Sequence, residues 1–271
     1  MFGPKKIICL TEEPTELLYL LGESERIIGI SAYTERPPIA KLEKPKVSAF
    51  IKGNVNKIEK LKPDLVVGFS DIQGQLAKDL IERGLNVLIF NQRSIMEIFE
   101  AMMILGGIVG KNKETATLIE NWKNSIEEFK MKSKLFERRP KVFFQEWDEP
   151  IITGIKWVSE AISIAGGEDA FGNLQNEKLA KNRIVTAEAV AQTNPDIILG
   201  SWCGKPMDWE WVRNKLEWQN TSAILKGNIF EIDPSIILQP GPALFIEGIP
   251  KLHEIFSSVT CLLYTSDAAD E

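Results

Sequence analysis

Tryptophan is the residue type whose placement in this chain best fits ligand binding. The 271 residues include seven tryptophans, and five of them lie between positions 147 and 211. Flat aromatic faces suit a large planar ligand, because stacking adds to the apolar area removed from water. Trp202 and Trp147 each follow a predicted strand, so we expect both to contact a ligand. Three others lie in helical patterns and are expected to pack in the core: Trp122, Trp157 and Trp218.

Residues that could support catalysis or metal capture are scarce. The chain has one histidine, His253, which is expected on the exposed side of the last helix. Transition metals need several converging nitrogen, sulfur or oxygen ligands. Cys203 has no histidine near it in the sequence to act as a base, and no Gly-x-Ser-x-Gly, P-loop or Gly-x-Gly-x-x-Gly motif follows a predicted strand. The sequence therefore predicts a binding protein with no catalytic residue, no metal site and no catalytic cofactor.

Composition narrows the classes of partner. The net charge of -6, with a pI near 5.2, and the lack of a basic stripe argue against nucleic acid. The longest apolar runs fall short of the ~20 residues that a membrane span needs. The first predicted strand, residues 7–10, has no apolar signal region before it, so the chain is expected to be cytoplasmic or to lack an export signal in this sequence. Cys9 is expected to be a buried small hydrophobic residue.

Two segments, residues 54–70 and 186–202, repeat each other without a gap. In each, a capping residue (Asn54 or Thr186) opens a short helix, and a Pro-Asp pair ends it. The apolar run that follows is too short and too uniformly apolar for a one-sided surface strand, so it predicts a strand buried on both faces of a parallel sheet. Two similar lobes are implied.

The ends of these two strands define the predicted site. Ligands of open α/β sheets bind beyond the carboxyl ends of the strands. Four residues take this place in the two repeats: Phe69, Ser70, Ser201 and Trp202. A site between the two lobes is the expected arrangement.

The predicted fold class is α/β, with two lobes that each hold a mainly parallel sheet flanked by helices, bridged by one long helix. The first lobe is expected to have strands at 7–10, 26–30, 65–69 and 86–90, helices at 14–21, 55–61 and 75–83, and a loop through Pro37 and Pro38. The second is expected to have strands at 141–145, 196–200 and 228–232 and helices at 157–165, 186–192, 208–216 and 242–256. The predicted limits are 1–110 for the first lobe, 111–139 for the bridging helix and 140–260 for the second lobe. Residues 261–271 are interpreted as an artefact derived from a sequencing adapter.

The order of several motifs resembles a class III substrate-binding protein of ABC importers for cobalamin, siderophores and haem. The motifs are EPTELLYLLG at 13–22, IGISAYTERPP at 28–38, LKPDLVV at 61–67 and QPGP at 239–242. The resemblance spans residues 5–256, and the cobalamin-binding branch is the nearest match, through the loop at 31–38 and through Trp147 with GSWCG at 200–204. It implies non-catalytic binding of cobalamin in a cleft between the lobes, for delivery to an ABC transporter permease. Tyr33, Phe50 and Phe69 match aromatic positions that contact the ligand in this family.

The resemblance also implies a docking surface. In the family one Glu per lobe, at the third position of the repeated helix motif, contacts the permease; Glu188 stands there in the second lobe and Asn56 in the first, with Glu59 one turn later. The expected protein is a monomer of the periplasm or cell envelope. Alternatives are a siderophore binder, a haem binder with Tyr33 as iron ligand, and an enzyme or cytoplasmic corrinoid-handling protein on the same fold.

Overall fold

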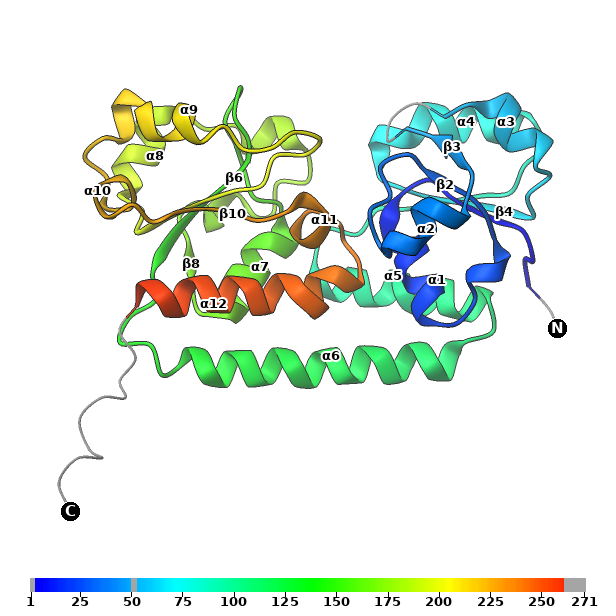
Figure 1. The fold of residues 1–271 in the computed structure, drawn as a ribbon, viewed down its shortest axis with the longest axis horizontal. Coiled ribbons are helices and arrows are strands. Elements are labelled where there is room, and N and C mark those ends of the chain that lie inside the picture. Colours follow the sequence, from blue (N-terminus) through cyan, green and yellow to red (C-terminus); the bar gives the residue numbers. More distant parts are fainter. Residues whose placement is uncertain (1–2, 50–52, 261–271) are drawn as a thin grey trace, which may run out of the picture. The chain divides into compact units, whose positions relative to one another are not determined.

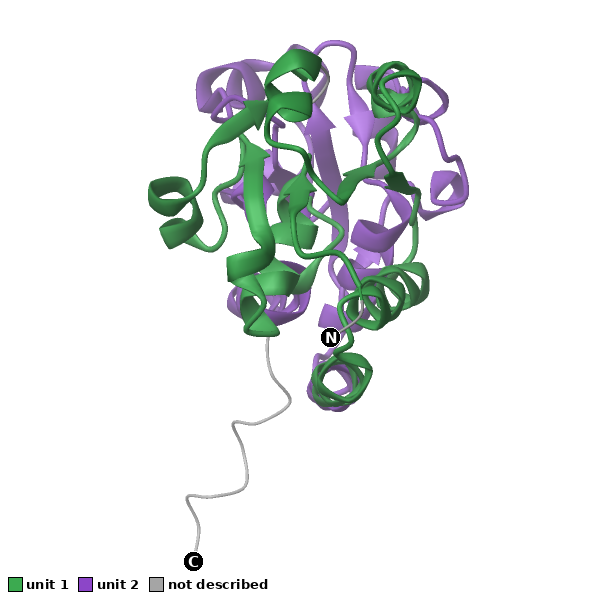
Figure 2. Ribbon diagram, turned by 90° about the vertical axis from the view of Figure 1, so that its right-hand side faces the viewer, with its two compact units in different colours: residues 1–121, 239–242 green, residues 122–238, 243–271 purple. Residues whose placement is uncertain are grey.

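The computed structural model describes residues 3–49 and 53–260 (Figure 1). The chain forms two compact units. Unit 1 comprises residues 1–121 and 239–242, and unit 2 comprises residues 122–238 and 243–271 (Figure 2). The division in the sequence falls inside helix α6 (Asn112–Ser133), and the chain returns briefly to unit 1 at 239–242. The domain limits expected from the sequence stay a prediction.

Unit 1 holds a sheet of five parallel strands in the order β3-β2-β1-β4-β5. The strands are β1 (Ile7–Cys9), β2 (Ile27–Ser31), β3 (Lys46–Ser48), β4 (Leu65–Phe69) and β5 (Val87–Phe90). The central strands β1 and β4 are buried on both faces, which explains why their sequences are apolar without alternation. Because all five run parallel, their carboxyl ends meet at one edge.

Helices cover both faces of this sheet, above and below it in Figure 1. Helices α3 (Val55–Lys60) and α4 (Gly74–Glu82) bury Ile58, Leu76 and Leu80 against one face. Helix α1 (Glu12–Leu20) packs on β1, β2 and α5 (Ile95–Ile108). Helix α2 (Pro38–Glu43) lies between β2 and β3 in the sequence. Residues after β1 and β5 that begin α1 and α5 are thus held at the carboxyl edge.

Unit 2 contains a second mainly parallel sheet in the order β10-β9-β6-β7, with β8 also paired to β6. The strands are β6 (Lys141–Trp147), β7 (Ile152–Thr153), β8 (Glu168–Asp169), β9 (Ile197–Gly200) and β10 (Ile229–Glu231). Only the short β7 pairs antiparallel to its neighbour among the described strands of this sheet. The carboxyl ends of β6, β9 and β10 again share one edge.

The helices of unit 2 enclose an aromatic core. They are α7 (Lys156–Ala165), α8 (Ala187–Thr193), α9 (Trp209–Asn214), α10 (Ser222–Lys226), α11 (Pro234–Ile237) and α12 (Ile249–Val259). One buried cluster joins Phe143 and Ile198 of the sheet to Val190 and Val212 of the covering helices and to Trp218 of a short 3-10 turn, Leu216–Trp218. Helix α7 packs on β8 and on α12. None of the described helices is long and apolar enough to cross a membrane.

The fold class predicted from the sequence is confirmed, and so is the repeated helix-strand unit. The Asn54 side chain accepts a hydrogen bond from the Lys57 amide at 2.9 Å, and the Thr186 side chain accepts one from Ala189 at 3.1 Å. Strands β4 and β9 follow at the predicted positions. The loop expected through Pro37 and Pro38 is in part wrong, because Pro38 begins α2 and β3 follows it. Residues 261–271 lie outside the described part of the chain.

Candidate functional site

The candidate site is built from loops that leave the carboxyl ends of the parallel strands. In unit 1 these loops follow β1, β2, β4 and β5, and in unit 2 they follow β6 and β9. Open α/β sheets bind ligands at such edges, because loops from several strands converge there. The two edges are described in turn.

Glu12 anchors the loop that carries Tyr33. Its carboxylate Oε2 accepts hydrogen bonds from the backbone amides of Glu35 and Arg36, the second at 3.0 Å. The Arg36 guanidinium also pairs with Glu16 at 3.0 Å. Tyr33 itself is 58% exposed, so the loop is held by buried acids while the ring remains open to contact.

The acids at this edge have strongly raised pKa values. Burial raises the pKa of Glu12 to about 8, and neighbouring Glu16 and Glu13 add to the shift. Burial likewise raises the pKa of Glu13 to about 7, although the Thr11 hydroxyl opposes this by donating to the carboxylate at 2.7 Å. Near neutral pH, this edge therefore has a smaller negative charge than the number of its acids suggests.

Phe69 ends strand β4 and is covered by a cation. The guanidinium of Arg93 lies 5.1 Å from the centre of the Phe69 ring, and Nη2 of Arg93 pairs with Asp71 at 3.1 Å. Ser70, the next residue, has φ of 68° and ψ of 168°, a region that non-glycine residues rarely adopt. Its hydroxyl accepts a hydrogen bond from the Ile72 amide at 3.4 Å. The structure thus places Phe69 beneath Arg93, buried rather than open.

The edge of unit 2 brings two predicted aromatic residues together. The ammonium of Lys205 lies 4.5 Å from the ring centre of Trp147 and 4.9 Å from that of Trp202. The same ammonium pairs with Asp148 at 2.7 Å. Trp147 is half-buried, and its indole N–H donates to the carbonyl of Glu149 at 3.0 Å. Trp147, Trp202, Lys205 and Asp148 therefore form one cluster, which we call the Lys205 cluster.

Trp202 lies deeper than its strand-end position suggests. It is 1% exposed and belongs to the core cluster of unit 2, with Met207 and Val212. Its ring meets Trp211 edge to face, with 6.0 Å between the ring centres. Its indole N–H is buried without a hydrogen-bond partner in the described residues. Trp202 is placed as a core residue in this structure, and its contact with a ligand stays a prediction.

The two predicted docking residues lie in the first turns of equivalent helices. Asn56 in α3 and Glu188 in α8 are both exposed. Hydrogen bonds from the backbone amide of Glu188 and from the Thr186 hydroxyl lower the pKa of Glu188, and the positive charge of Lys215 adds to this. Glu188 therefore offers a negative charge, whereas Asn56 offers none. Phe50, the remaining predicted residue, lies outside the described residues.

The remaining tryptophans and the histidine pack inside unit 2. Trp122, Trp157 and Trp218 are buried, as predicted. The expectation that His253 lies on the exposed side of the last helix is wrong. Its ring is half-buried, stacks on Phe136 with 5.2 Å between ring centres, and places Nδ1 3.0 Å from the carbonyl oxygen of Ala165. Within the described residues, no group of three or more His, Cys, Asp or Glu side chains is gathered to hold a metal ion.

The charged residues that cover the aromatic rings were missed from the sequence. Arg93 and Lys205 each lie in a loop after a strand and each pairs with an aspartate in another such loop. The available signal was position alone, because both pairs join residues that are far apart in the sequence. Glu12 and Glu13 were also missed, because acids in the first turn of a helix are favoured at exposed positions too and so give no sign of burial.

Comparison with known proteins gives consistent matches. A family model described as periplasmic binding protein matches residues 7–236. An uncharacterised ABC transporter substrate-binding lipoprotein of Bacillus subtilis is 27% identical over 267 residues, which cover 93% of this chain and 79% of the relative. The vitamin B12-binding protein of Vibrio parahaemolyticus is 25% identical over 261 residues, which cover 94% of this chain and 90% of the relative.

Solved structures share the fold. The periplasmic haem-binding protein RhuT of Roseiflexus sp. RS-1, in its apo form, matches with a TM-score of 0.80 and 18% identity, covering 95% of this chain and 99% of that one. At this level of identity the likeness shows the fold alone.

Proposed function

The chain belongs to the periplasmic binding protein family, and from that premise we propose that it binds cobalamin or a related corrinoid and delivers it to the permease of an ABC importer. As a family member it is a substrate-binding protein and not an enzyme. The match to a vitamin B12-binding protein over 94% of the chain supports the corrinoid assignment. Extracytoplasmic location belongs to the same proposal.

The Lys205 cluster is the observation that carries this proposal. A corrinoid offers a broad, partly apolar ring that gains from contact with flat aromatic surfaces. Trp147 supplies such a surface at the carboxyl edge of unit 2, and Tyr33 supplies an exposed ring at that of unit 1. Because Asp148 neutralises Lys205, the cluster suits a ligand whose rim is polar and largely uncharged, as the amide side chains of a corrinoid are.

Lys205 sets a condition for stacking on the tryptophans. Its ammonium lies over both rings, so a planar ligand that stacks on Trp147 from that side must displace it or share the ring with it. A cation over an aromatic ring contributes about 0.5–1 kcal/mol at exposed sites. That cost is small beside the free energy gained when a corrinoid removes apolar area from water. Lys205 therefore modulates affinity without blocking the site.

Two matched tryptophan variants test the proposed contact. Trp147 and Trp209 are both half-buried and both lie under a cation, Lys205 at 4.5 Å and Arg213 at 5.7 Å from the respective ring centres. Trp147 ends strand β6, whereas Trp209 belongs to α9. Trp147→Ala should weaken cyanocobalamin binding by about 1–3 kcal/mol, and Trp209→Ala should leave the affinity unchanged. Equal losses of cyanocobalamin affinity in both variants would show that Trp147 makes no specific contact with the ligand.

Haem is the second candidate ligand, and the exposure of Tyr33 favours it. A phenol oxygen is a known haem-iron ligand, and the Tyr33 ring is 58% exposed on a loop anchored by Glu12. Haem titration followed by the Soret band separates the two proposals. A saturating complex whose spectrum changes in Tyr33→Phe would support haem, and unsaturable, variant-independent spectra would rule haem out as the ligand.

A further inference from the structure

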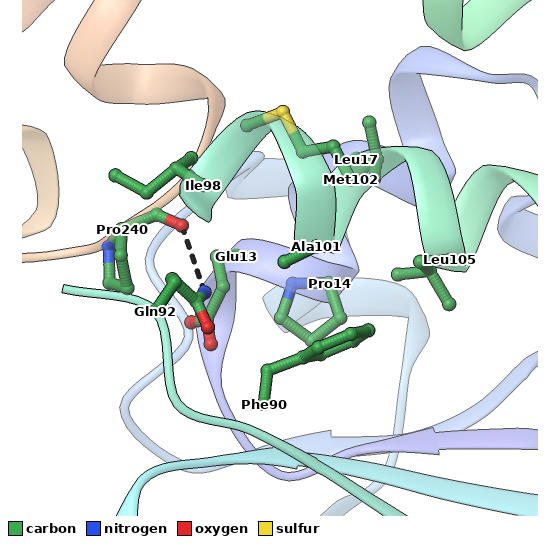
Figure 3. Close-up of a pocket in the computed structure, with 11 residues that line it drawn as sticks. Glu13, Pro14, Leu17, Phe90, Gln92, Ile98, Ala101, Met102, Leu105 and Pro240 are labelled. Carbon is green, nitrogen blue, oxygen red and sulfur yellow. Dashed lines mark hydrogen bonds between the residues drawn. The ribbon is translucent and has the colours of Figure 1, made fainter. Parts of the chain in front are cut away.

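A small cavity lies in unit 1 where three segments of the chain meet (Figure 3). Its volume is about 20 Å³. Glu13 contributes from the first turn of α1, Gln92 from the connection between β5 and α5, and Pro240 from the segment that returns at 239–242. The rest of the wall is mainly apolar and includes Leu17, Phe90, Ile98, Ala101, Met102 and Leu105.

Two buried oxygen atoms of the residues that line this cavity have no hydrogen-bond partner in the described chain. They are Oε2 of Glu13 and Oε1 of Gln92, and the two side chains are 7% and 5% exposed. The other polar atoms of both side chains are paired: Oε1 of Glu13 accepts from the Thr11 hydroxyl at 2.7 Å, and Nε2 of Gln92 donates to the Pro240 carbonyl at 3.3 Å. Buried polar groups in folded proteins are nearly always hydrogen-bonded to protein or to ordered water.

Rotating the Gln92 amide by half a turn still leaves the side chain with an unfavourable polar contact. If oxygen and nitrogen exchanged places, the amide oxygen would face the carbonyl oxygen of Pro240, and two acceptors would oppose each other. The Pro240 carbonyl therefore fixes the orientation of the amide, and Oε1 of Gln92 has no hydrogen-bond partner in the described chain. Oε1 of Gln92 is an acceptor, and Oε2 of Glu13 is an acceptor when the carboxyl is ionised, so the missing partner is a hydrogen-bond donor.

We propose that the cavity binds one water molecule, which donates one hydrogen bond to Oε2 of Glu13 and the other to Oε1 of Gln92. A water needs roughly 10–15 Å³ of such space and at least two polar partners. The cavity has about 20 Å³, and Oε2 of Glu13 and Oε1 of Gln92 are the two partners. Hard cations prefer six or more oxygen ligands, whereas this wall is mainly apolar. If Glu13 carries a proton, it donates to the same water, which still donates to Gln92.

The water links the returning segment to the sheet edge of unit 1. The close approach of that segment requires glycine at position 241, because a Cβ there would lie 2.6 Å from the Cβ of Glu13. Gln92 holds the Pro240 carbonyl, and the water joins Gln92 to Glu13. The proposal concerns unit 1 alone and holds whichever ligand the protein binds.

A crystal structure of the full chain at about 1.5 Å resolution tests the proposal. We expect one isolated density peak in the cavity, at roughly 2.7–3.2 Å from both oxygen atoms. Gln92→Met, which removes the amide, should abolish the peak, and Gln75→Met, at an exposed glutamine of α4, should leave it in place. Water-to-amide nuclear Overhauser effects near Glu13 give a second readout on the wild-type chain if Gln92→Met fails to fold.

Three outcomes would overturn the proposal. The first is an empty cavity in the wild-type structure together with no long-lived water signal. The second is direct contact between Glu13 and Gln92, which would show that a proton on Glu13 serves as the donor. The third is a peak with five or six oxygen ligands, which would identify a cation.

Discussion

Replacing Glu12 by Gln should change how the stability of unit 1 depends on pH. Burial raises the pKa of this carboxyl from 4.5 to about 8 in the folded chain. Between these values the folded state keeps a proton that the unfolded state has lost, so the free energy of unfolding falls as pH rises. At about 1.4 kcal/mol per pKa unit, Glu12 alone should remove about 3–4 kcal/mol between pH 5 and pH 8. Glu12→Gln carries no titrating proton, so this part of the slope should disappear.

Hydrogen exchange is the suitable assay because it reports on each unit separately. All seven tryptophans lie between positions 122 and 218, in unit 2, so tryptophan fluorescence does not follow unit 1. The Leu10 amide, which donates to Val67 at 2.7 Å in the centre of the sheet, is a direct probe. Glu100→Gln, at an exposed position of α5, is the control and should keep the wild-type slope. A wild-type slope that survives in Glu12→Gln would refute the reasoning.

Three further predictions concern unit 2 and the permease. Trp202→Ala should lower the stability of unit 2 by about 3–5 kcal/mol, because the Trp202 ring is enclosed in the core. A urea midpoint equal to that of the wild type would show that Trp202 is not a core residue. Lys205→Met should leave the urea midpoint near wild type and change cyanocobalamin affinity by no more than about tenfold, the limit set by a cation over two rings; complete loss of binding would make Lys205 an essential ligand contact. Glu188→Arg should reduce uptake in cells that carry the cognate importer without changing ligand affinity, because a reversed charge repels a basic partner. Asn56→Glu should leave uptake unchanged or improve it. A lower ligand affinity in Glu188→Arg would contradict the docking role.

The sequence predicted those elements whose signals are local. Asn54 and Thr186 cap their helices through their own side chains, and the Pro-Asp pair that follows ends each helix within a few residues. Helix α2 was missed because two adjacent prolines suggest a loop, although proline is well suited to the first turn of a helix. Strand β7 was missed because its two residues give no periodicity.

The candidate site was less accessible to sequence reasoning, because tertiary packing determines it. Trp202 follows a strand and a glycine, which favours an exposed position, yet Met207 fills the space above Gly200 and helps to bury the ring. Lys205 pairs with Asp148, which lies 57 residues earlier in the sequence, and no local pattern predicts that pair. The burial that raises the pKa values of Glu12 and Glu13 likewise arises only when α1 packs at the sheet edge.

Calorimetric titration of the purified chain with cyanocobalamin tests the central claim most directly, with haem and a ferric siderophore as parallel titrants. We expect cyanocobalamin to bind with one-to-one stoichiometry at micromolar protein and the other two to give no saturable heat. Absence of heat with cyanocobalamin, together with a saturable signal from haem or the siderophore, would contradict the corrinoid assignment and leave a substrate-binding protein for a different ligand.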